Sequence, residues 1–166
     1  MILVKKTGEE NIPAIQELVQ LTWPVTYGPI IGQAQLDYMM QLIYNTEALK
    51  EQMYKKGHQF IVAAEHNVPV GFASYSVKNS DVPTIYRLHK LYIDPVQQGK
   101  GIGKILFNFI LNDIKPFGAT DLELNVNRFN SAKLFYEKIG FKVIAEEDID
   151  IGNGYFMNDY VMNYKL

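Results

Sequence analysis

The chain has 166 residues, of which 48% are hydrophobic and 20% charged, with a formal net charge of −2 at pH 7. We expect one domain spanning residues 1–166 with a sizeable core, no nucleic-acid partner because the charge is not basic, and no membrane partner because no apolar run reaches roughly 20 residues. The absence of cysteine excludes disulfides, thiolate metal ligands and a cysteine nucleophile, and it is compatible with a cytoplasmic location.

Hydrophobic periodicity and turn residues predict the elements in chain order. Strands are predicted over residues 2–7, 58–65, 68–78, 84–95, 121–126, 141–150 and 155–166. Helices are predicted over residues 10–23, 33–44, 46–56, 102–115 and 130–139. The first helix has Asn11 as a possible N-cap and Pro13 in its first turn, and we expect Pro24 to end it and residues 25–32 to form a loop.

The two helices in the second half of the chain have distinct apolar faces. The first of them is predicted to bury five apolar residues at helical spacing: Ile102, Ile105, Leu106, Phe109 and Ile110. The second has Asn130 or Ser131 as N-cap and Gly140 after its last turn. Its buried face is predicted to consist of Ala132, Phe135 and Ile139, with Tyr136 beside it.

The order of elements indicates the fold class. A strand, a helix and another strand follow one another between residues 84 and 126, which predicts a right-handed crossover between two parallel strands. The remaining strands read as antiparallel, with a hairpin turn at His66 and Asn67. We therefore expect an α/β fold with a mixed, mostly antiparallel sheet of seven strands flanked by helices.

The segment "QQGKGIGK", residues 97–104, joins the strand of that crossover to its helix. Glycines without Cβ atoms at a helix N-terminus leave backbone N–H groups open to an anion, and the positive end of the helix dipole adds to this. A tight turn with solvated lysines is the alternative. The spacing fits neither a Walker A loop nor a G-x-G-x-x-G dinucleotide loop, because Gln98, Lys104 and Ile105 stand where those motifs need other residues.

Two segments together resemble the GNAT superfamily of acyl-CoA-dependent N-acetyltransferases. The family pattern Q/R-x-x-G-x-G/A is met by Gln98, Gly101 and Gly103, and "NSAKLFYEKIGF" resembles the family's last helix. The resemblance covers almost the whole chain and implies a splay between the two central parallel strands. It also implies that acetyl-CoA is the cosubstrate, that its pyrophosphate lies on the glycine loop, and that no metal is needed.

The resemblance implies roles for particular residues. Coenzyme-binding roles fall on Leu91, Ile93, Gln98, Gly99, Lys100, Gly101, Ile102, Gly103, Lys104, Asn130, Tyr136 and Lys138. The N–H of Leu91 would also stabilise the oxyanion of the acetyl group. Tyr136 would protonate the leaving thiolate. From the residues alone, a core aromatic is the favoured interpretation of Tyr136.

The amine acceptor needs help to react, because a primary alkylamine with a pKa of about 10.4 is almost entirely protonated at pH 7. His89 is the candidate base, since strand alternation predicts that it shares a face with Leu91 and Ile93. Many family members carry glutamate there, and an ordinary strand histidine is the alternative. His58 and His66 read as loop residues, and the three histidines are too scattered to indicate a metal site.

Acceptor contacts are predicted from Trp23 and Tyr27, with packing as the alternative for Trp23. Carboxylates such as Glu65, Asp148, Asp150 or Asp159 would suit a cationic amine but also fit a solvated surface. A narrower resemblance to PaiA-type spermidine/spermine acetyltransferases implies a polyamine or another small amine as acceptor. A protein N-terminal or lysine acetyltransferase and a non-catalytic acyl-CoA sensor remain alternatives, and a homodimer is possible.

Overall fold

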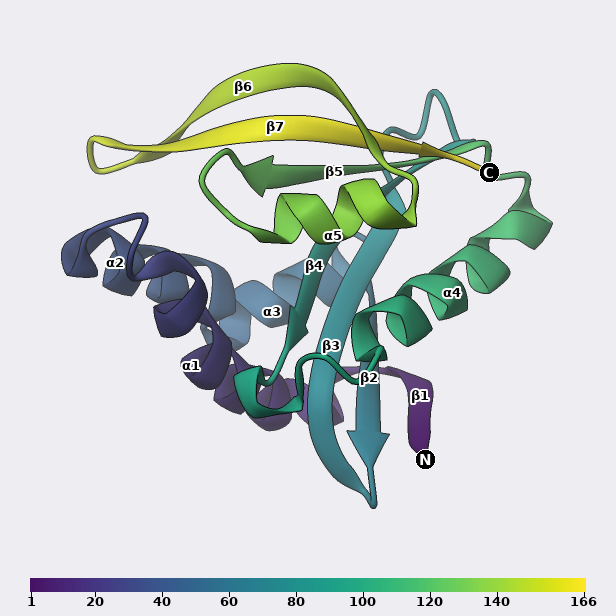
Figure 1. Ribbon diagram of the computed structural model, residues 1–166, viewed down its shortest axis with the longest axis horizontal. Coiled ribbons are helices and arrows are strands. Elements are labelled where there is room, and N and C mark those ends of the chain that lie inside the picture. The colour runs from purple at the N-terminus through teal and green to yellow at the C-terminus, as the bar shows by residue number, and fades with distance from the viewer.

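In the computed structural model, which describes residues 1–166, one seven-stranded sheet has helices on both faces (Figure 1). The strand order is β1-β2-β3-β4-β5-β7-β6, and only the pairing of β4 with β5 is parallel. The strands are β1 (Ile2–Thr7), β2 (Gln59–Glu65), β3 (Val68–Val77), β4 (Ile85–Ile93), β5 (Asp121–Asn127), β6 (Lys142–Gly152) and β7 (Tyr155–Lys165). The predicted α/β fold with a mixed, mostly antiparallel sheet is confirmed.

Five helices cover the sheet from two sides. They are α1 (Ile12–Tyr27), α2 (Gln33–Tyr44), α3 (Thr46–Tyr54), α4 (Ile102–Ile114) and α5 (Ala132–Ile139). Helices α1 to α3 build one core, in which Ile15 and Leu49 pack with Phe60 of β2. Helices α4 and α5 build the other core, in which Leu106 and Ile110 share a cluster with Leu122 of β5. None of the helices is long and apolar enough to cross a membrane.

Helix α1 ends later than predicted. Pro24 lies inside it, and the helix runs on to Tyr27. Proline removes one backbone donor, but the carbonyl of Pro24 still accepts a hydrogen bond from the N–H of Gly28 at 3.0 Å. Trp23 and Tyr27 are buried on either side of Pro24, and this packing stabilises the last turn. Asn11 does precede the helix, but its side chain donates to Thr7 Oγ1 instead of capping.

The buried faces of α4 and α5 also differ from prediction. Ile105 is 37% exposed and Phe107 is buried in its place, so the stripe of α4 is rotated toward Phe107. In α5 the only buried residue is Tyr136, while Phe135 is half-buried. The aromatic ring of Tyr136 packs edge-on against Phe141, at the start of the closing hairpin. Tyr136 is therefore the residue of α5 nearest to the core.

Two irregularities of β4 open the sheet. Its parallel pairing with β5 ends at Leu88 and Leu124, although both strands continue. In its pairing with β3, Lys90 lies opposite Ser74 and Leu88 opposite Tyr75, so His89 is the extra residue of a β-bulge. A bulge bends its strand and increases the local twist. β4 and β5 therefore diverge beyond Leu88, as predicted.

Candidate active site

A cavity of about 1170 Å³ is lined by residues of β4 and β5 where the two strands diverge. On one face of the sheet it is lined by the glycine loop and by α4 and α5, including Tyr136. On the other face it is lined by the end of α1 and the residues after it, including Tyr27 and Ile30. The cavity therefore reaches both faces of the sheet, and two reactants can enter from opposite sides.

Backbone amides dominate the loop before α4. None of the six consecutive N–H groups from Gly99 to Lys104 donates to an acceptor within the protein, and the N-cap position, Gly101, offers no side chain. The backbone alternates in handedness there, with φ of +84° at Gly99 and +78° at Gly101. Such a concave run of amides at a helix N-terminus binds phosphate groups. The residues present thus fit the diphosphate of a coenzyme.

The third glycine of the loop serves packing. A Cβ atom on Gly103 would lie 3.0 Å from Cζ of Phe135, whereas Gly99 and Gly101 face open space. Gly103 therefore lets α4 approach α5 closely, a reason that the sequence alone did not indicate. Lys104 lines the cavity, but the ammonium of Lys100 is turned aside, where it donates to Gln97 Oε1 at 2.6 Å.

Most of the predicted site residues line this one cavity. The lining includes Tyr27, His89, Leu91, Ile93, Gln98, Gly99, Gly101, Ile102, Gly103, Lys104, Asn130, Tyr136 and Lys138. Asn130 is buried, and its side-chain oxygen accepts from the N–H of Ala132 at 2.9 Å, which fixes the turn before α5, whose N-cap is Ser131. The individual coenzyme contacts of these residues, and the oxyanion contact of the Leu91 N–H, stay predictions.

Trp23 does not line the cavity. It is 3% exposed, and its ring lies 4.5 Å from that of Tyr27 and 5.3 Å from that of Tyr44, measured between centroids. The prediction that it contacts the acceptor is therefore wrong in this structure. Tyr27 does line the cavity, and its hydroxyl lies 3.0 Å from the hydroxyl of Tyr92, a lining residue that the sequence did not single out.

Tyr136 has the environment of a phenol that stays protonated. It is 8% exposed, and burial, with the nearby Tyr27 as a smaller cause, raises the pKa of its hydroxyl. A protonated hydroxyl can donate to a developing thiolate. Because an ordinary thiol has a pKa of about 8.5, complete proton transfer from this phenol to sulfur would be uphill.

His89 lies on the opposite face from the one predicted. The bulge breaks the alternation of β4, so its ring stacks on that of His58, just after α3, with centroids 3.8 Å apart. Nε2 of His89 is 2.7 Å from Ser76 Oγ. Burial and the nearby His58 lower the pKa of His89 to about 2. The prediction that the histidines are scattered is wrong for this pair. Because its pKa is low, His89 is a weak proton acceptor.

Two polar residues of the cavity region were not identified as a pair from the sequence. Asn125 of β5 lines the cavity, and Asp159 of β7 is 4% exposed, so the solvated-surface alternative for Asp159 is wrong. Alternation along β7 would have put Asp159 on one face with Val161, which is also buried. Asn125 and Asp159 come together because β7 lies beside β5 in the sheet, which the sequence alone does not show.

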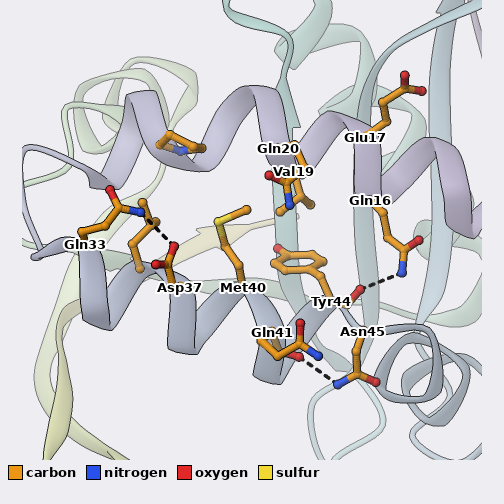
Figure 2. Close-up of a pocket in the computed structure, with 12 residues that line it drawn as sticks. Gln16, Glu17, Val19, Gln20, Gln33, Asp37, Met40, Gln41, Tyr44 and Asn45 are labelled. Carbon is orange, nitrogen blue, oxygen red and sulfur yellow. Dashed lines mark hydrogen bonds between the residues drawn. The ribbon is translucent and has the colours of Figure 1, made fainter.

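A second hollow of about 590 Å³ lies between α1 and α2 (Figure 2). Its walls are mostly amide and carboxylate side chains. Gln33 donates to Asp37 at 2.8 Å, and Gln16 and Asn45 donate to main-chain oxygens of α2. Tyr44 is shared between this hollow and the aromatic cluster around Trp23. No residue of the glycine loop borders the hollow. The candidate active site is therefore the cavity through the sheet.

Comparison with known proteins agrees with this assignment. A sequence model of the acetyltransferase (GNAT) domain matches residues 31–162. The chain is 27% identical over 161 residues to the spermidine N(1)-acetyltransferase of Thermoplasma acidophilum, a match covering 94% of this chain and 95% of that relative. A crystal structure of the PaiA N-acetyltransferase from the same organism, in complex with coenzyme A, aligns with a TM-score of 0.83 at 26% identity, covering 100% of this chain and 99% of that one.

Shorter matches connect the chain to enzymes named for protein substrates. It is 35% identical over 92 residues to the ribosomal protein bS18-alanine N-acetyltransferase of Haemophilus influenzae, covering 55% of this chain and 57% of that relative. It is 33% identical over 92 residues to the peptidyl-lysine N-acetyltransferase YjaB of Escherichia coli, covering 55% and 54%. The matching domain, the splayed sheet and the loop of free amides lead to one conclusion: the chain belongs to the GNAT family of N-acetyltransferases.

Proposed function

We propose that this enzyme transfers the acetyl group of acetyl-CoA to a primary amine of a small molecule, a polyamine such as spermidine being the first candidate. The observation that carries the coenzyme part is the run of six unpaired amides from Gly99 to Lys104 at the start of α4. The coenzyme A complex of the Thermoplasma relative supports the same reading. The lack of cysteine is compatible with direct transfer and with a cytoplasmic location.

The reaction needs a neutral amine nitrogen next to the thioester carbon. The nitrogen forms a bond to that carbon, the carbon–sulfur bond breaks, the nitrogen loses a proton and the sulfur leaves as a thiolate that is then protonated. Tyr136 would donate a hydrogen bond to the leaving sulfur, and the free β5-facing edge of β4 beyond Leu88 would orient the acyl arm. Preorganised donors of this kind act on charge that develops in the transition state.

Proton removal from the amine needs an acceptor other than His89. His89 is held by Ser76 and His58, and its pKa of about 2 makes it a poor match for an ammonium group. We propose that the ammonium loses its proton to water within the cavity. The acceptor side of the cavity, lined by Thr26 and Tyr27, would hold this water.

A small amine fits the comparisons better than a protein substrate. The match to the spermidine enzyme runs over 94% of the chain, so it includes the segments that wall the acceptor side. The matches to the two enzymes with protein substrates cover 55% of the chain each, at higher identity. Protein acetylation therefore remains the second candidate.

A panel of acceptors with acetyl-CoA tests the proposal, with free thiol as the readout. The panel contains spermidine, a monoamine, a peptide with a free N-terminus and a lysine peptide blocked at its N-terminus. We expect thiol release with spermidine above the rate without acceptor. Turnover of a peptide alone would favour the second candidate, and coenzyme binding without any turnover would favour an acyl-CoA sensor.

A further inference from the structure

No carboxylate lines the active-site cavity. The charged side chains in its lining are three lysines, Lys90, Lys104 and Lys138. The acids that would suit a cationic amine on sequence grounds all lie outside the lining; they are Glu65, Asp148, Asp150 and Asp159. A polycation that entered the cavity would therefore lose hydration without gaining an ion pair.

The acceptor side presents apolar surface instead. Val25, in the last turn of α1, lines the cavity and is 62% exposed, so it lies at the mouth. Pro29 and Ile30 continue this wall after the helix. Ile30 and Tyr92 also pack against the core that α1 to α3 build, which places them on the acceptor face of the sheet. A cavity wall of this kind suits an apolar ligand group.

Two main-chain carbonyls at the end of α1 are available to a single ammonium group. The carbonyl of Val25 has no donor four residues later, because Pro29 lacks an N–H. The N–H of Ile30 donates to the carbonyl of Tyr27 at 2.9 Å and not to that of Thr26. The carbonyls of Val25 and Thr26 therefore accept no main-chain N–H. They lie at the negative end of the helix dipole, which favours a cation.

We propose that the acceptor is a primary amine with one positive charge and an apolar body, selected by Val25, Pro29 and Ile30. Neutral oxygens at the end of α1 hold the ammonium group, and the hydrocarbon body lies on the apolar wall. A second ammonium group has no partner in the lining, so a diamine binds less well. The inference rests on the proposed function and narrows its acceptor: comparison with relatives puts spermidine first, whereas the lining of this cavity favours a monoamine.

The first test compares n-butylamine with 1,4-diaminobutane, which share one carbon chain and differ by the second ammonium group. Their kcat/KM values are measured at pH 7.5 with saturating acetyl-CoA. A second positive charge lowers the pKa of the first ammonium group, so the diamine would react faster if binding were indifferent to charge. We expect n-butylamine to be favoured by about tenfold, because the second charge of the diamine is desolvated without a partner. Equal or higher kcat/KM for the diamine overturns the inference.

The second test places an acid at the mouth. Val25→Asp should shift the ratio of the two kcat/KM values toward the diamine by about fivefold, the effect of one partly exposed ion pair. Val68→Asp is the matched control, because Val68 is also 62% exposed and lies outside the cavity. It should leave the ratio unchanged. Calorimetry with acetyl-CoA checks that both variants are folded, and an unchanged ratio in folded Val25→Asp contradicts the selection by this wall.

A binding measurement separates this inference from the proposed function. The same two amines are titrated by calorimetry into protein saturated with coenzyme A. Tighter binding of n-butylamine supports the acceptor class even without turnover, and tighter binding of 1,4-diaminobutane overturns it. No thiol release with any amine in the presence of acetyl-CoA overturns the proposed function and leaves the binding preference standing.

Discussion

The two halves of the active-site cavity are built from different parts of the chain. The coenzyme half is main chain: six amides in sequence from Gly99 to Lys104, within one loop and one helical turn. The acceptor half is side chain, and its lining residues Thr26, Tyr27 and Asn125 come from α1 and β5. The first half depends on glycines that keep the backbone path, with φ of +84° at Gly99 and +78° at Gly101, whereas the second depends on side chains from separate elements and on strand register.

The largest expected effect is at the coenzyme half. Gly101→Glu should abolish detectable acetyl-CoA binding, because it places a side chain and a negative charge at the amides of the α4 N-terminus. Calorimetry with acetyl-CoA measures this. Gly118→Glu is the control, since Gly118 has nearly the same backbone, with φ of +82° against +78°, equally open space and no place in the cavity. If both variants bind equally well, the amides do not hold the diphosphate.

The next effect is expected where the two halves meet. Tyr136→Phe should reduce kcat by about 100-fold, the lower end of the range for a single general acid, with unchanged acetyl-CoA affinity. Stopped assays of thiol release and calorimetry measure the two quantities. Tyr54→Phe, at an exposed position in α3, provides the control. A kcat equal to that of wild type would assign Tyr136 to packing alone.

A moderate effect on stability is expected from the stacked pair His58 and His89. Burial lowers their pKa values to about 4 and about 2 from 6.5, so the unfolded chain binds more protons than the folded chain below pH 6.5. Stability is therefore fully present above pH 6.5 and is lost as pH falls toward 4. Urea unfolding at several pH values between 7.5 and 4.5 measures the slope of the free energy of unfolding against pH. His58→Phe should make it shallower, and an unchanged slope would mean that His58 does not contribute.

The smallest effect on activity is expected at Trp23. Trp23→Phe should leave KM for the amine within about twofold, while the free energy of unfolding falls by about 1–2 kcal/mol through lost packing. Tyr27→Phe removes one hydroxyl from the cavity lining and its bond to Tyr92, so its KM should rise more. Steady-state kinetics measures KM for each variant, and urea unfolding measures its stability. A larger rise in KM for Trp23→Phe would return Trp23 to the acceptor site.

Sequence reasoning was most accurate where a signal is local. The bounds of β1 and α2, the hairpin turn at His66 and Asn67, and the parallel crossover follow from contiguous residues, and all are observed. Errors arose where packing overruled the local rule. Pro24 lies within a helix because its neighbours are buried, and Ile105 is exposed because the α4 stripe centres on Leu106 and Phe107.

The run of unpaired amides was determined by the sequence itself, because a glycine-rich turn before an amphipathic helix presents consecutive amides wherever the helix lies in the fold. The tertiary structure decided the acceptor side. One extra residue in β4 turned His89 away from Leu91, and the placement of β7 beside β5 buried Asp159 next to Asn125. Side-chain convergence depends on register and bulges, which are properties of paired strands and are not written in any one of them.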